Sequence, residues 1–132
     1  MGYEVKFYFV HKCSYCLAED KVPPSITVAM IDMGKVWYEE KPRKLLELFD
    51  RKADFSITVD EWNDEKNDWT PQDITEDCYG TPLHYCSNMK AAAKLAKEAA
   101  KETSIHTFKI FSDMLKGFSK YEDNMYCVLY GY

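Results

Sequence analysis

Residues 3–10, with the sequence YEVKFYFV, predict a β-strand near the start of the chain. Apolar and aromatic side chains recur there at a period of two, which is typical of a strand with one face in a hydrophobic core. The face expected in the core carries Tyr3, Val5, Phe7 and Phe9. A sheet with a buried face is therefore the starting point for the fold.

Four further segments have the composition of strands, because β-branched or aromatic residues recur in them. They are residues 25–33, 36–39, 54–60 and 125–132. Gly34 and Lys35 separate the first two of these segments, and a glycine there suits a tight reversal of the chain. A hairpin between these two segments is therefore expected.

The last of these segments, MYCVLYGY at residues 125–132, is expected to form a strand at an edge of the sheet. Tyr126, Tyr130 and Tyr132 then lie on its outward face. An edge strand exposes unpaired backbone groups, to which a second copy of the chain can add a strand. A homodimer formed through an edge strand is therefore one option for a partner.

Three segments have helical patterns. Pro42 suits the first turn of a helix, and the apolar spacing that follows predicts a helix over residues 42–52. Ser87 and Asn88 are good N-cap residues before MKAAAKLAKEAAKE, whose alanine and lysine content favours a helix. A third helix is predicted over residues 105–117 by apolar side chains that recur on one face.

Strands and helices are partly segregated along the chain, and this order favours an α+β fold. We expect a single domain over residues 1–132, with a mainly antiparallel sheet of four to five strands packed by about three helices. No apolar run reaches the about 20 residues that a membrane span needs. A cytoplasmic protein with no membrane partner is therefore expected.

Negative charge is concentrated in residues 60–77. Eight carboxylates and one cation, Lys66, give this segment a formal net charge of −7, whereas the whole chain carries −5. No regular period is visible from about residue 61 to 86, so an irregular acidic segment is predicted there. Trp62 and Trp69 lie among these charges, and tryptophan is enriched among residues that dominate binding at interfaces.

Charge excess, loss of periodicity and two tryptophans in one segment predict a small acidic protein-binding module, inhibitory in one version of the hypothesis. Its loop would dock on a basic surface of a macromolecular partner, for example a nucleic-acid-binding protein. The same negative field opposes direct binding of nucleic acid by this chain. The residues expected to make the contact are Glu61, Trp62, Asp64, Glu65, Asp68, Trp69 and Asp73.

In general character the chain is similar to virus-encoded inhibitors of host nucleic-acid enzymes. This similarity is one of size and composition, and no shared motif carries it. The alternative for the acidic segment is that both indole rings fold back on the sheet and anchor a solvated loop that binds nothing.

A zinc site is the second hypothesis. HKCSYC at residues 11–16 places Cys13 and Cys16 at the spacing of half a structural zinc site. The candidates for the other ligands are Cys78, His84 and Cys86. Zinc bound there would order two segments that lack a regular period. The spacing of the downstream residues departs from that of paired zinc knuckles, and small buried thiols explain the same cysteines without a cofactor.

A small thiol-dependent enzyme is the third alternative, because a C-x-x-C motif can lower the pKa of a thiol. Such an enzyme needs a base beside the nucleophile, and the three histidines form no recognisable motif with a cysteine. Five cysteines, an odd number, fit a reducing compartment better than a set of disulfides. We therefore expect a non-enzymatic binding protein.

Overall fold

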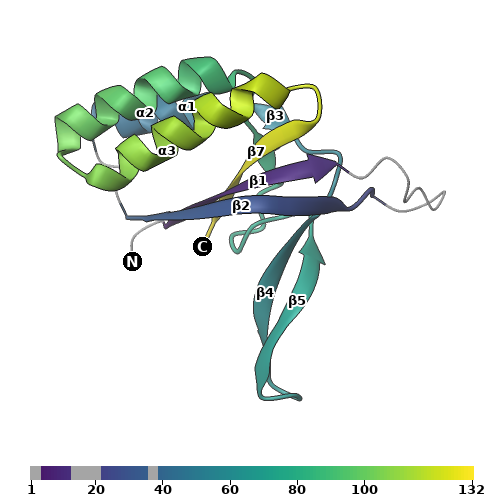
Figure 1. The fold of residues 1–132 in the computed structure, drawn as a ribbon. Helices are drawn as coiled ribbons and strands as arrows, with labels where there is room; N and C mark the ends of the chain where they lie inside the picture. Colours follow the sequence, from purple (N-terminus) through teal and green to yellow (C-terminus); the bar gives the residue numbers. More distant parts are fainter. Residues whose placement is uncertain (1–3, 13–21, 36–38) are drawn as a thin grey trace.

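The chain forms a layer of helices, an antiparallel sheet beneath it and a hairpin that projects from the sheet (Figure 1). The computed structural model describes residues 4–12, 22–35 and 39–132. The sheet runs in the order β2 (Ser25–Gly34), β1 (Val5–Lys12), β7 (Met125–Gly131), β6 (His84–Tyr85) and β3 (Arg51–Lys52). The helices are α1 (Glu40–Glu47), α2 (Met89–Thr103) and α3 (His106–Phe118), followed by a short 3₁₀ turn, η1 (Ser119–Tyr121). The hairpin consists of β4 (Ile57–Asn63) and β5 (Asp68–Ile74).

This architecture confirms the predicted α+β fold with a mainly antiparallel sheet and three helices. Among the described residues, no helix combines the length and the apolar character that a bilayer span requires.

β1 lies inside the sheet, between the edge strand β2 and the middle strand β7, and both of its faces are buried. Phe7 and Phe9 face the helices, whereas Tyr8 and Val10 belong to a second apolar cluster on the other face. The prediction of a single buried face was therefore wrong. A central strand that is covered on both sides buries both sets of alternate residues.

The larger core lies between the sheet and the helices. The rings of Phe7 and Phe111 stack with centroids 4.3 Å apart, and those of Phe9 and Phe118 stack at 4.6 Å. Phe49, which follows α1, packs against Phe7 at 4.9 Å. Helix α3 supplies its rings from one face because apolar residues recur there at helical spacing. These ring contacts hold α3 against β1.

The smaller core lies on the opposite face of the sheet. Tyr8 and Val10 from β1 meet Val128 from β7, and the cluster continues into Phe55 and Ile57 at the base of the hairpin. The hairpin is therefore anchored by buried apolar side chains at its base, whereas the residues farther along it leave the core.

Helix α2 begins and ends with defined caps. The Asn88 side chain accepts a hydrogen bond from the Ala91 N–H at 3.0 Å, as the sequence predicts for an N-cap residue. Ser104 closes the helix in the left-handed conformation, with φ of 59°. Four alanines on the inner side of α2, Ala92, Ala93, Ala96 and Ala99, are buried. Small side chains there allow α1 and α3 to approach the helix closely.

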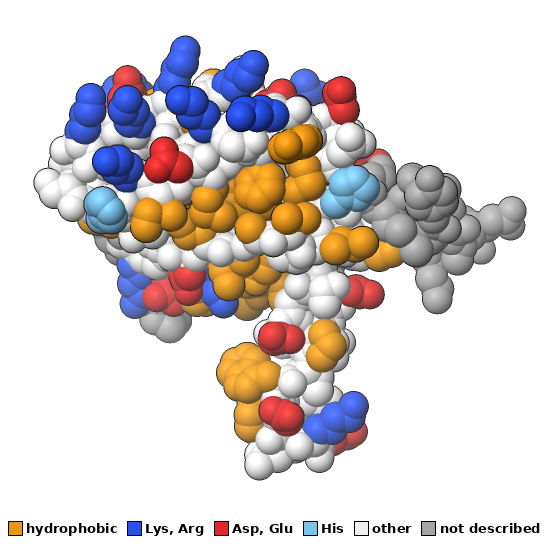
Figure 2. Space-filling model, in the orientation of Figure 1, with side chains coloured by type: hydrophobic (Ala, Val, Ile, Leu, Met, Phe, Trp, Pro, Cys, Tyr) orange, Lys and Arg blue, Asp and Glu red, His pale blue; other side chains and the backbone are white. Residues whose placement is uncertain are grey.

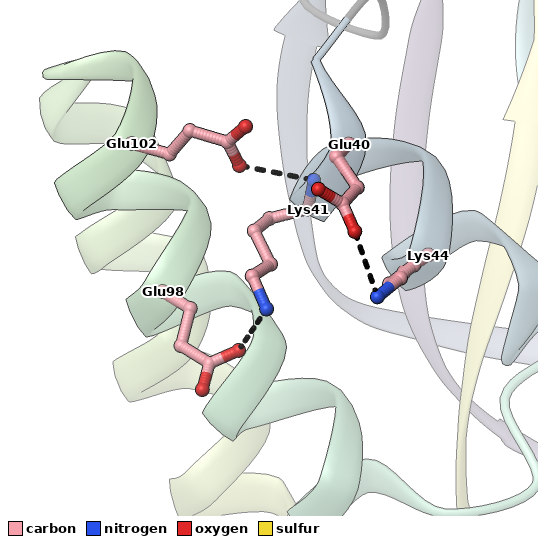
Figure 3. Close-up of polar contacts among 5 residues, drawn as sticks. All are labelled: Glu40, Lys41, Lys44, Glu98 and Glu102. Atoms are coloured by element: carbon pink, nitrogen blue, oxygen red, sulfur yellow. Dashed lines mark hydrogen bonds and ion pairs between the residues drawn. The ribbon is translucent and has the colours of Figure 1, made fainter.

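Polar contacts join α1 to the outer side of α2 (Figure 3). The Lys41 ammonium group lies 3.4 Å from Glu98, and the Lys41 backbone N–H donates a hydrogen bond to Glu102 at 3.0 Å. Lys44 pairs with Glu40 one turn earlier in α1. These groups are largely exposed, so each ion pair contributes little to stability. They orient the two helices more than they stabilise them.

One prediction about the sheet was wrong. It concerns β7, which lies between β1 and β6 and is no edge strand. The segment at residues 25–33 pairs with β1. Of its predicted return strand, residues 36–38 lie outside the described residues, and Glu39 is the N-cap of α1. The described edge strands of this sheet are β2 and β3.

The ring stack on α3 leads to a stability prediction. Phe111→Ala removes a fully buried ring that contacts Phe7 and Phe9, so we expect the free energy of unfolding to fall by about 3–5 kcal/mol. Equilibrium unfolding in urea measures this loss. Ile110→Ala, one residue earlier at a half-exposed position of the same helix, serves as the matched control and should cost less than about 1 kcal/mol. Equal losses in the two variants would contradict the described packing of α3.

Candidate functional site

The acidic segment forms a regular hairpin over most of its length. β4 and β5 pair antiparallel from Ile57 opposite Ile74 to Asn63 opposite Asp68. The prediction of an irregular segment at about 61–86 was therefore wrong, because it contains the end of β4, all of β5 and the short strand β6. Beyond its base, the hairpin extends away from the body of the protein (Figure 1).

The turn of the hairpin is closed by its own polar side chains. The Asn63 side chain accepts a hydrogen bond from the Lys66 N–H at 3.1 Å. Asn67 adopts a left-handed conformation with φ of 51°, which asparagine tolerates better than most residues. Asp68 accepts a hydrogen bond from the Trp69 N–H. The residues that make the segment acidic and polar also form this turn.

One face of the hairpin carries both tryptophans. Strand pairing places Trp62 opposite Trp69, Asp60 opposite Pro71, and Thr58 opposite Asp73. Because side chains alternate between the two faces of a strand, these three pairs share one face. All six residues are exposed, and we call this surface the tryptophan face.

The two indole rings of the tryptophan face contact each other. Their centroids are 5.8 Å apart, and the planes meet at 74° in an edge-to-face arrangement. The Trp62 indole N–H also donates a hydrogen bond to the Asp64 carboxylate at 2.7 Å. The side chains are nevertheless 48% exposed for Trp62 and 62% exposed for Trp69. The alternative that both rings fold back on the sheet therefore does not hold.

The other face of the hairpin explains why it stands out from the body. At its base, Ile57 and Val59 are buried and Ile74 is half-buried against the smaller core. Farther out, the same face carries Glu61 and Asp68, which are exposed. Burial of the base and solvation of the tip present the tryptophan face at a distance from the sheet.

The carboxylates of the hairpin surround the tryptophan face and its turn. Asp64 and Glu65 lie in the turn, whereas Asp73 shares the tryptophan face, where it accepts a hydrogen bond from the Thr58 hydroxyl at 2.7 Å. Within the part of the chain that the structure describes, none of the hairpin carboxylates forms an ion pair. Figure 2 shows acidic and apolar side chains on the projecting hairpin and lysines over the helices. The hairpin is therefore a negatively charged pole with two aromatic rings on its surface.

All seven predicted binding residues are exposed on the hairpin, and strand pairing divides them into three groups. Trp62, Trp69 and Asp73 share the tryptophan face, Asp64 and Glu65 form part of the turn, and Glu61 and Asp68 lie on the opposite face. The structure adds three exposed residues to the tryptophan face, Thr58, Asp60 and Pro71. The equal distances of Trp62 and Trp69 from the centre of the turn could have indicated this pairing in the sequence.

The predicted zinc ligands are distributed over different surroundings. Cys86 is buried in the larger core, Cys78 is exposed, and His84 Nδ1 lies 2.7 Å from the Pro82 carbonyl oxygen. Cys13 and Cys16 lie outside the described residues. Within residues 4–12, 22–35 and 39–132, no three His, Cys, Asp or Glu side chains come together to hold a metal ion. The zinc hypothesis stays a prediction that no described cluster supports.

The described thiols also bear on the enzyme hypothesis. Burial raises the pKa of Cys86 to about 11, and burial raises the pKa of Cys127 as well. Both thiols therefore stay protonated at neutral pH and are poor nucleophiles. The Cys78 sulfur lies 3.0 Å from the Tyr130 hydroxyl, whose pKa is raised by burial and by this hydrogen bond.

Comparison of the chain with protein-family models, curated proteins and solved structures finds no significant match. The case for a function therefore rests on the geometry and the charges of the hairpin.

Thiol labelling checks the described environments of the cysteines. In a Cys13→Ser, Cys16→Ser background, the exposed Cys78 should react with a thiol reagent at pH 7 at least about 100-fold faster than Cys86, because burial shields the Cys86 sulfur from the reagent and raises the pKa of its thiol to about 11. Mass spectrometry of the native protein during labelling gives the site-specific rates. Labelling after denaturation provides the control, since all three thiols should then react alike. Rapid labelling of native Cys86 would contradict its burial.

Proposed function

We propose that this chain is a binding protein that docks the tryptophan face of its β4–β5 hairpin on a basic surface of a macromolecular partner. The observation that carries the proposal is the pair of contacting, exposed indole rings in a segment, residues 60–77, whose formal net charge is −7. Contiguous apolar area on a protein surface often marks a site that a partner covers.

The arrangement suits binding for two physical reasons. The Trp62 indole is already oriented by the Asp64 carboxylate and by Trp69, so little side-chain entropy remains to be lost on docking. The surrounding carboxylates favour association with a cationic surface and are screened by salt. The rings then contribute most of the binding affinity. The carboxylates select a positively charged partner surface and increase the association rate.

A basic surface of this kind is typical of proteins that bind nucleic acid, because phosphates need cations to neutralise them. A hairpin docked on such a surface excludes the phosphates from it. The proposed module would therefore inhibit a partner of this class by competing for its cationic groove.

Tryptophan fluorescence provides the first test of the hairpin. In a Trp37→Phe background the remaining indoles are Trp62 and Trp69, and an arginine-rich peptide serves as the basic probe. We expect their emission to shift to shorter wavelength on binding, because the probe removes water from the rings. Trp62→Ala should weaken binding by about 30-fold, the effect of losing about 2 kcal/mol at an interface hot spot.

The charge contribution needs a separate variant. Replacing Asp64 and Asp68 by Asn and Glu65 by Gln should weaken binding to the same probe and flatten its dependence on salt. The matched control neutralises three exposed carboxylates elsewhere, Glu47, Asp113 and Asp123, and so has the same net charge. Similar affinities and similar salt slopes in the two variants would exclude the hairpin as the docking surface.

A further inference from the structure

A groove on the helical layer carries the opposite charge to the hairpin. It lies between α2 and α3, has a volume of about 490 Å³, and five lysines line it. These are Lys90, Lys94, Lys97, Lys116 and Lys120. A neighbouring hollow along the same two helices shares Lys97 and adds Lys101 and Lys109. We call this surface the lysine groove, and Figure 2 shows lysines gathered over the helices.

The lysines of this groove are not neutralised by neighbours. Within the described part of the chain, none of the seven forms an ion pair. The two carboxylates of α2, Glu98 and Glu102, reach the other way and contact Lys41 on α1 (Figure 3). Only Asp113 adds a carboxylate from α3. The groove is therefore a locally cationic surface on a chain with a net charge of −5.

The floor of the lysine groove is formed by small residues. Ala93 and Ser112 lie there, and the Ser112 hydroxyl donates a hydrogen bond to the Ala93 carbonyl at 2.7 Å. Because this hydroxyl already donates a hydrogen bond within the protein, the floor is poorly suited to hydrogen-bond a polar ligand. The aliphatic stems of the lysines add apolar surface at the sides, with the ammonium groups at the rim. The groove therefore suits an occupant that combines an apolar surface with surrounding negative charges.

The hairpin of this same chain has that chemistry. Trp62 and Trp69 form an apolar pair, and carboxylates such as Asp60, Asp64 and Asp73 surround it. The helices and the hairpin lie on opposite sides of the sheet, so a hairpin cannot reach the groove of its own chain (Figure 1). Contact between the two surfaces requires two molecules.

We propose that the chain associates head to tail with itself, with the tryptophan face of one copy docked in the lysine groove of the next. This inference rests on the proposed function of the hairpin and names a second copy of the chain as a partner. The two surfaces differ, so the contact is heterologous and each bound copy leaves one hairpin and one groove open. Assemblies therefore grow with concentration and shorten with salt, because the contact depends on opposite charges.

Sedimentation velocity tests the association directly. Between about 1 µM and about 1 mM protein, the weight-average sedimentation coefficient should rise with concentration at low salt. It should return toward the monomer value at about 500 mM NaCl, where charges are screened within a few ångströms. A monomer at every concentration and low salt overturns the proposal. That result leaves the proposed function intact if the hairpin still binds the basic peptide.

Two variants then identify the surfaces. Lys94→Glu with Lys97→Glu should abolish growth, and so should Trp62→Ala with Trp69→Ala, since each removes one side of the contact. Lys35→Glu with Lys52→Glu changes the net charge by the same amount at exposed sites outside the groove. This control variant should still associate with itself, whereas the lysine-groove variant should not. Association that persists in the lysine-groove variant would overturn the proposal.

A mixing experiment distinguishes head-to-tail contact from any symmetric dimer. The lysine-groove variant keeps its hairpin, and the tryptophan variant keeps its groove, so a mixture of the two should form a 1:1 complex that grows no further. Absence of this complex overturns the proposal. A fluorescently labelled DNA duplex is added to each variant in parallel. Duplex binding that depends on Lys94 and Lys97, without self-association, would assign the groove to phosphates instead.

Discussion

Burial of β1 on both of its faces is the constraint on which the rest of the structure depends. On one face, Phe7 and Phe9 require ring partners, and α3 supplies them with Phe111 and Phe118. On the other face, Tyr8 and Val10 require cover as well, and the base of the hairpin provides it. A strand with water on one side would need only one of these layers. Because both faces of β1 are buried, the helices and the hairpin pack on opposite sides of one sheet.

This division into two sides also separates the charges. The helices keep their lysines on the surface that faces away from the sheet, and the hairpin carries its carboxylates outward on the other side. Opposite charges on one molecule would neutralise each other if they were adjacent. Here they lie on opposite sides of the sheet, and salt screens exposed charges over about 8–10 Å. Each of the two surfaces can therefore bind a partner of the opposite charge. The net charge of −5 for the whole chain does not reflect the local charge of either surface.

The hairpin shows how stability and exposure are combined in one element. An isolated two-stranded hairpin is marginally stable in water. Here Ile57 and Val59 anchor the base in the smaller core, while the cross-strand contact of Trp62 and Trp69 supports the distal part. The same contact presents both rings to solvent. The two tryptophans thus stabilise the tip without packing against the body of the protein. The same residues therefore stay available for binding.

The sequence by itself determined the local elements. The alternation around Phe7, the Asn88 cap and the apolar spacing of α3 each depend on neighbours within a few residues, and all three were predicted. The acidic character of residues 60–77 and the presence of two tryptophans among these charges were also visible, since charge and composition need no fold, whereas the exposure of both rings was not. Only the tertiary structure decided the pairing. It placed β7 between β1 and β6, paired β2 with β1, and turned the acidic segment into a hairpin whose distal strands have solvent on both faces and so carry no apolar period. Strand order arises from contacts between residues that are distant in the sequence, and a local pattern does not record such contacts.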